Sequence, residues 1–277
     1  TNQRMTKKKI FLIISLFLLI LTSFRMGWMI YHQTPDHPHA EGGIMDLSDW
    51  EFNDSQTITL DGEWEFFPNQ FISTTLDQSQ LMEKAEFISV PGKWNDSFME
   101  NEKASPYGYG TYRLKIILPD NEEQLYGIRI KDATTAANVY IDGLLVAESG
   151  HPGETATDSK GDTGPFFTLF SPNSNEVELM MHVSNFEDPL KGGITKSIKI
   201  GTENAINKEA NESITLQIVV SVIYLLHSIY AFIIYYMGKG KYQKEVFYFG
   251  LMLVLHGVTI LIDDDIVLHL CAQEREI

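Results

Sequence analysis

The sequence predicts a mainly β fold, an extracellular β-sandwich flanked by transmembrane α-helices. Three observations support this prediction. Eight short strand-like segments lie between residues 57 and 200, Gly, Pro, Asn and Asp separate them, and three almost purely apolar stretches lie outside them. The 277 residues are enough for about two domains.

Charge separates the chain into the same parts. The whole chain has a net charge of −16, whereas residues 32–212 alone contain 31 acidic and 12 basic side chains, a net charge of −19. A region with this net negative charge would repel the phosphates of a nucleic acid, which excludes nucleic-acid binding through charge. The single cysteine, Cys271, excludes an internal disulfide and a cysteine-rich zinc site.

The first apolar stretch, residues 10–31, predicts a membrane anchor. Residues 1–9 before it contain Arg4 and three consecutive lysines, so the positive-inside rule places them in the cytoplasm and residues 32–212 outside. A cleaved signal peptide is the alternative, but residues 22–27 offer no clear small-x-small cleavage site.

Residues 32–45 are interpreted as a juxtamembrane linker. They contain a small histidine cluster with nearby acidic residues, namely His32, His37, His39, Asp36 and Glu41. A metal site needs three or four converging ligands, and Pro35 and Pro38 favour an extended chain, so no metal ligand and no cofactor is predicted.

Residues 46–205 are predicted to form the sandwich. Alternation and β-branched or aromatic enrichment predict strands at residues 57–60, 63–67, 86–90, 111–118, 126–131, 137–141, 176–183 and 197–200. Turn residues at positions such as Asp142-Gly143 separate them. Many short strands without a helical stretch indicate a β-sandwich of the jelly-roll type.

Two further apolar stretches, residues 214–237 and 246–262, predict membrane helices. The loop between them, residues 238–245, contains three lysines and is therefore placed inside. The predicted protein is thus a multi-pass protein of a bacterial plasma membrane in contact with lipid. Residues 263–277 are interpreted as a truncated tail, either of a fragment or of an interrupted reading frame.

Five motifs in order resemble a known family: residues 60–64 (LDGEW), Val90-Pro91 with Trp94, residues 108–113 (GYGTYR) with the strand after them, residues 139–143 (VYIDG) and residues 150–153 (GHPG). They resemble the galactose-binding-like jelly roll of bacterial seven-transmembrane receptors with diverse intracellular signalling modules. A related module forms the N-terminal sugar-binding domain of many family 2 glycoside hydrolases. The resemblance covers roughly residues 46–200.

The resemblance implies a sensor that binds a small extracellular ligand, such as a carbohydrate, and passes a signal through a helical bundle to an effector such as a histidine kinase. No effector is recognisable in these residues, so the chain is predicted not to be an enzyme. The alternative is a membrane-anchored carbohydrate-binding or cell-envelope protein without signalling output. The ligand and effector type are open, and a homodimer is compatible with the sequence.

Aromatic residues are the candidate ligand contacts. Trp94, Tyr107 and Tyr109 lie in a turn-rich stretch, and sugars stack on exposed aromatic rings. The alternative is a core role, which the strand pattern favours for Trp64 and Tyr112 and which is also open for Trp94. The carboxylates Glu63 and Glu65 share one strand face, most simply a solvated one, and no catalytic residue is predicted.

His227 and His256 each lie ten residues from the inner end of a predicted span. At a rise of about 1.5 Å per residue both would lie near the middle of the membrane. Ionisable groups at that depth usually face other helices, so the pair is predicted either to form hydrogen bonds between helices or to act as a membrane relay.

Overall fold

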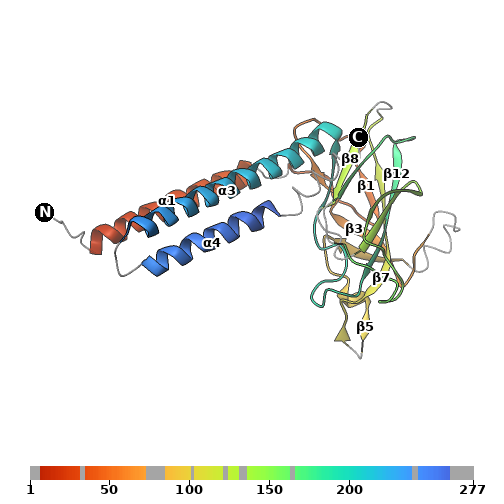
Figure 1. Ribbon diagram of the computed structural model, residues 1–277. Coiled ribbons are helices and arrows are strands. Elements are labelled where there is room, and N and C mark those ends of the chain that lie inside the picture. The colour runs from red at the N-terminus through yellow and green to blue at the C-terminus, as the bar shows by residue number, and fades with distance from the viewer. Residues whose placement is uncertain are drawn as a thin grey trace, which may run out of the picture. The chain divides into compact units, whose positions relative to one another are not determined.

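The computed structural model describes residues 7–31, 35–72, 85–100, 103–120, 124–130, 136–162, 166–238 and 243–262. The chain divides into two compact units, Thr1–His37 and Pro38–Ile277. The first contains the helix α1 (Lys7–Tyr31), and the second contains the strands and the helices α3 and α4. Figure 1 shows the strands of the second unit gathered at one end of α3.

Two sheets form the body of the second unit. The larger has the order β10-β9-β12-β7-β3-β4, with β1 parallel to β7. Its strands are β1 (Ile44–Asp46), β3 (Gly62–Pro68), β4 (Glu86–Val90), β7 (Gly108–Ile117), β9 (Ala136–Ile141), β10 (Leu144–Ser149) and β12 (Glu176–Asn185). The smaller has the order β11-β8-β13-β2, formed by β11 (Phe166–Phe170), β8 (Tyr126–Ile130), β13 (Ile198–Thr202) and β2 (Ile58–Thr59). A short hairpin of β5 (Met99–Glu100) and β6 (Lys103–Ala104) follows the 3-10 helix η1 (Asn95–Ser97).

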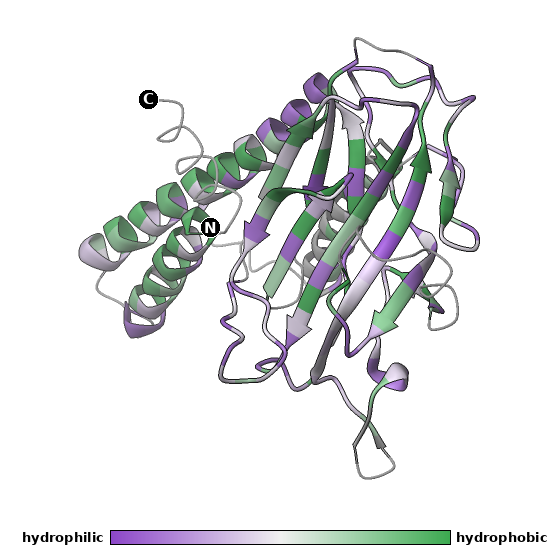
Figure 2. Cartoon of the chain, turned by 90° about the vertical axis from the view of Figure 1, so that its right-hand side faces the viewer, coloured by the Kyte–Doolittle hydropathy of each residue, from purple (hydrophilic) through white to green (hydrophobic). Residues whose placement is uncertain are grey.

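One hydrophobic core lies between the two sheets. The larger sheet contributes Trp64, Phe66 and Tyr112, and the smaller contributes Ile128 and Ile200, all at most 1% exposed. Because successive strand residues point to opposite faces, every second residue of β3 and β7 enters this core. Figure 2 shows this alternation as green and purple bands along the strands. The prediction of a mainly β fold is confirmed.

The turn between β9 and β10 is one of those that the sequence predicts. Asp142 and Gly143 both have positive φ, 48° and 78°. A two-residue turn with φ > 0 at both positions matches the twist of the strands on either side, which explains why an Asp-Gly pair occurs here.

The helix α3 (Glu203–Met237) is joined directly to the smaller sheet. Thr202, the last residue of β13, caps it by accepting a hydrogen bond from the Ala205 N–H at 3.1 Å. One turn further, the Glu209 carboxylate accepts hydrogen bonds from Thr57 Oγ1 (2.6 Å), Lys199 Nζ (2.7 Å) and Arg129 Nη1 (3.2 Å). We call Thr202, Glu209 and these three partners of Glu209 the α3 clamp. Burial alone would raise the pKa of Glu209, but Lys199, Thr57 and Arg129 together hold it below its usual value.

The helices α3 and α4 (Gln243–Leu261) pack along each other (Figure 1). Small residues lie in their contact: Ser221 Oγ donates to the Gly257 carbonyl at 2.7 Å, and a Cβ on Gly250 would lie 3.1 Å from the Phe232 ring. Both helices are long and apolar enough to cross a membrane by length and composition, and α3 begins eleven residues before the predicted span.

Candidate functional site

The outer face of the larger sheet carries a group of aromatic rings that point away from the core. On β12, His182 lies opposite Asn138 of β9 and Thr111 of β7, and two residues earlier Met180 lies opposite Tyr140. These residues alternate with Val139, Val183 and Tyr112, which are buried in the core. The strand register therefore brings side chains from three strands together on one surface.

Four rings on this face form a continuous row. The ring centroids of Tyr140 and His182 are 4.7 Å apart, those of His182 and Phe71 are 4.9 Å apart, and those of Phe71 and Tyr109 are 5.0 Å apart. The His182 and Phe71 rings are stacked, with 26° between their planes. We call these four residues the aromatic row. All four are partly exposed, so their rings are held by neighbours yet accessible from solvent.

Backbone hydrogen bonds hold Phe71 over the sheet. Thr111 Oγ1 accepts from the Ile72 N–H at 3.0 Å and donates to the Gln70 carbonyl at 2.8 Å. His182 Nε2 lies 2.7 Å from the Ile72 carbonyl oxygen. Because the carbonyl can only accept, Nε2 must carry the proton, which leaves Nδ1 as the acceptor of the neutral ring. Burial lowers the pKa of His182, against the effect of its bond to Ile72, so the ring is neutral at pH 7.

Carboxylates outnumber free cations on this face. The strands of the larger sheet contribute two cations, Arg113 and Lys115, and both are paired. Arg113 contacts Glu65 and lies 3.7 Å from Glu178, and Lys115 Nζ lies 2.6 Å from Glu176. Burial raises the pKa of Glu178, while the charge of Arg113 opposes the shift.

The predicted contact Trp94 belongs to the core. It is 1% exposed, donates from Nε1 to the Pro106 carbonyl at 3.0 Å and stacks against Tyr112. No ring face is left for a ligand, because Gly192 and Gly193 pack directly against this indole. The core alternative for Trp94 is therefore the correct one.

The two predicted tyrosines have different surroundings. Tyr107 is 38% exposed and lies before β7, whereas Tyr109 is part of the aromatic row. Burial, followed by the charge of Glu154, raises the pKa of Tyr109. The sequence prediction did not include Phe71, Tyr140 and His182. The sequence does contain one signal for Tyr140 and His182. Both alternate with apolar residues along their strands, which predicts that they lie on the outer face of the sheet.

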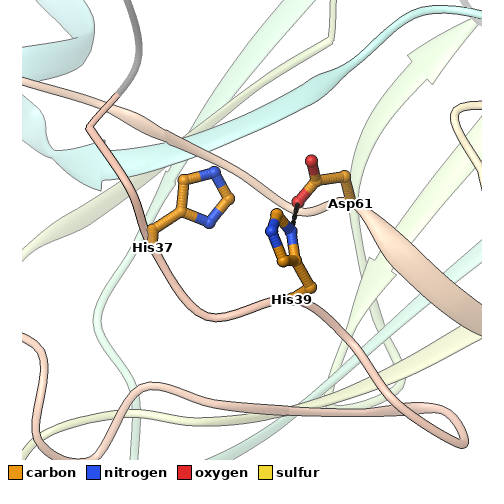
Figure 3. A group of neighbouring side chains, drawn as sticks. All are labelled: His37, His39 and Asp61. Atoms are coloured by element: carbon orange, nitrogen blue, oxygen red, sulfur yellow. Dashed lines mark hydrogen bonds and ion pairs between the residues drawn. The ribbon is translucent and has the colours of Figure 1, made fainter.

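One of the histidines after α1 has an acidic partner far away in the sequence. His39 Nδ1 lies 2.9 Å from Asp61 Oδ1 (Figure 3). Asp61 precedes β3 and is 22 residues from His39, so spacing alone could not identify it. Residues 40–44 pair with the sandwich, through Ala40 with Gly62 and through β1 with β7, instead of forming a free linker.

The two helix histidines each bond within their own helix. His227 Nδ1 lies 2.7 Å from the Ile223 carbonyl, and His256 Nδ1 lies 2.9 Å from the Met252 carbonyl. Both side chains are exposed, and the ring nearest His256 across the helix contact is that of Tyr224, at 6.1 Å. The relay role of His227 and His256 stays a prediction.

Comparisons with known proteins bear on the sandwich. No family model and no curated protein matches the chain. Solved structures do: a β-glucuronidase of Faecalibacterium prausnitzii (20% identity, 55% of this chain, TM-score 0.40) and a putative β-galactosidase of Bacteroides fragilis (19% identity, 53% of this chain, TM-score 0.38). A β-glucuronidase 2 of Bacteroides uniformis, a calcium-binding mutant, matches at 22% identity over 53% of this chain with a TM-score of 0.40. The matches cover 32%, 23% and 18% of those chains, less than a third of each.

These matches correct two predictions. The similar structures are glycoside hydrolases and not signalling receptors, which contradicts the predicted role as the sensor part of a signal-transduction receptor and leaves the histidine kinase without support. The prediction that the chain is no enzyme is contradicted by the same finding, since these structures are enzymes. At this level of identity the likeness concerns the fold alone.

Proposed function

We propose that this chain is a membrane-anchored protein whose β-sandwich, of the jelly-roll type, binds a saccharide at the aromatic row. The observation that carries the proposal is the row itself, four partly exposed rings in contact on one face of a rigid sheet. Aromatic rings supply large apolar contact surfaces while polar neighbours bond the hydroxyl groups of a ligand.

The row is suited to a flat ligand because it is already ordered. Tyr140 and His182 stand on adjacent strands, and Phe71 is fixed by the bonds of Ile72 and Gln70 to Thr111. A ring that is held before binding loses little conformational entropy when a ligand stacks on it. The His182 Nδ1 acceptor and the hydroxyl groups of Tyr109 and Tyr140 supply polar groups beside the rings.

The membrane part of the proposal rests on α3 and α4. Their outward side chains are exposed and apolar, including Ile218, Val222, Leu226 and Leu255. Their mutual contact uses serine and glycine, as in helices that associate inside a bilayer without a hydrophobic driving force. The lysines after Met237 support a topology with the loop between these helices inside and the sandwich outside.

Binding should be tested on the full chain in lipid nanodiscs, first on a glycan array and then by titration calorimetry with the glycans retained. Tyr140→Ala should weaken binding at least about tenfold, the equivalent of about 1.4 kcal/mol. Phe87→Ala is the matched control, because Phe87 is 55% exposed on β4 and lies outside the row.

Two results would overturn this proposal. One is the absence of binding to every saccharide. The other is binding that Tyr107→Ala weakens and Tyr140→Ala does not, which would place the site at the rim before β7.

Topology should be tested by cysteine labelling in a Cys271→Ser background. Asp158→Cys should react with an impermeant reagent added outside, and Lys241→Cys only after the membrane is opened. Labelling of Asp158→Cys from the inside alone would overturn the membrane arrangement.

A further inference from the structure

The charges around the aromatic row have one sign. Glu148 on β10 lies opposite Asn138, so its side chain is on the same face as His182, and it is exposed. At the other end of the row the Gly153 N–H donates to Ser184 Oγ at 3.3 Å, and Ser184 lies opposite Tyr109, which brings the exposed Glu154 near Tyr109. The charge of Glu154 accordingly raises the pKa of Tyr109, second to burial. Carboxylates therefore flank both ends of the row.

No unpaired cation of the sheet offsets these carboxylates. Arg113 and Lys115 are held by Glu65, Glu178 and Glu176. The loop that carries Glu154, residues 150–162, contains three acidic residues and one lysine, Lys160. Both cations on the described strands of the larger sheet are paired, and the loop has two more acidic than basic residues, so the charge around the row is predominantly negative.

The hydroxyl groups of Tyr109 and Tyr140 can donate or accept, whereas the other polar groups around the row can only accept. His182 is neutral at pH 7 and uses its Nε2 proton on the Ile72 carbonyl, so only the Nδ1 lone pair is left to it. The Glu148 and Glu154 carboxylates accept and cannot donate. A ligand that brings O–H or N–H donors fits this arrangement, and one that brings a carboxylate or a sulfate group does not.

We infer, resting on the proposed function, that the aromatic row selects neutral and amino sugars and rejects uronic acids and sulfated sugars. A ligand carboxylate would be placed between two like charges without an arginine or lysine of the sheet free to bind it. An ammonium group on the sugar ring would instead be attracted by Glu148 and Glu154. The expected order of affinity is amino sugar, then neutral sugar, then uronate.

The test is titration calorimetry of the full chain in nanodiscs at low salt with three oligosaccharides matched in length and linkage: a glucose oligomer, a glucosamine oligomer and a glucuronate oligomer. The glucose oligomer should bind at least about five times more tightly than the glucuronate oligomer, and the gap should shrink at 0.5 M salt because salt screens exposed charges.

The double variant Glu148→Gln/Glu154→Gln should narrow the same gap by improving glucuronate binding. Glu86→Gln should leave the gap unchanged, because Glu86 is an exposed residue of the edge strand β4 that pairs with the core residue Phe66, on the face of the sheet opposite to the row. A stable fold in each variant is checked by its unfolding midpoint.

The outcomes separate the two proposals. Glucuronate binding that equals or exceeds glucose binding would overturn the charge selectivity and leave saccharide binding intact. A preference that the double variant does not change would also overturn it, since the carboxylates would then not be its cause. No binding of any of the three oligomers would overturn both.

Discussion

The two faces of the larger sheet use the same kinds of side chain in opposite ways. On the inner face Trp64, Phe66 and Tyr112 are fully buried, with ring centroids 4.7 to 6.4 Å apart. On the outer face the rings of the aromatic row lie at similar distances but remain partly exposed. An aromatic cluster therefore indicates a core or a site only once it is known which face of the sheet its side chains occupy.

The largest difference between the faces should appear in stability. Trp64→Ala removes a fully buried indole and should lower the free energy of unfolding by about 3–5 kcal/mol. Tyr140→Ala removes a partly exposed ring and should cost about 1 kcal/mol or less. Urea unfolding of the chain in micelles, followed by circular dichroism, measures both. Equal losses would mean that the outer rings are a second core.

Close packing should make the inner face intolerant of even a methyl group. A Cβ on Gly110 would lie 2.7 Å from both the Phe66 ring and the Phe67 carbonyl oxygen. Gly110→Ala should therefore cost about 1–3 kcal/mol by overpacking. Glu63→Ala on the outer face should change stability by about 0.5 kcal/mol or less. The contrast would fail if both variants unfolded at the same urea concentration.

A further variant tests whether hydrogen bonds hold the side chains of the outer face in place. Thr111→Val keeps the shape of the side chain but removes the hydroxyl that bonds Ile72 and Gln70. The unpaired backbone groups should cost about 1–2 kcal/mol and loosen Phe71. Saccharide affinity should fall together with stability, whereas Thr111→Ser should keep both. Unchanged affinity in Thr111→Val would show that Phe71 needs no such support.

The smallest expected effect is on pH dependence. The pKa of His182 is lowered in the folded protein, so the unfolded chain takes up the proton first as the pH falls. Stability should therefore be fully present above the unfolded pKa of about 6.5 and decrease as the pH falls from there towards 5. His182→Gln should flatten this part of the profile. A profile with the same slope in the variant would show that another group is responsible.

The sequence predicts the strands better than it predicts the site. The strand β4 has the predicted bounds, residues 86–90, and the turn residues Pro91 and Gly92 mark its C-terminal end. In contrast β10 is missed, since this edge strand has an irregular register between Leu145 and Ala147 and no regular alternation. The three residues of β1 are too few to show a pattern at all.

The site depends on information that is not local in the chain. Tyr109 is recognisable from its place near the start of β7, but the other rings of the row come from β9, β12 and the segment after β3. Only the register of these strands decides that Tyr140 and His182 meet. Trp94 has the composition of a ligand contact, and only its burial shows that it is not one.

The α3 clamp determines how freely the sandwich can move relative to the apolar part of α3. Eleven polar-rich residues of α3, from Glu203 to Ser213, separate the sandwich from the apolar part of the helix, a length of about 16 Å. Because Glu209 and Thr202 fix this segment to the smaller sheet, it acts as a stiff stalk and not as a tether. In the proposed membrane arrangement, a stiff stalk would hold the aromatic row at one height and one tilt above the bilayer. Glycans attached to the same membrane would then be selected by the length of their chains as well as by their chemistry.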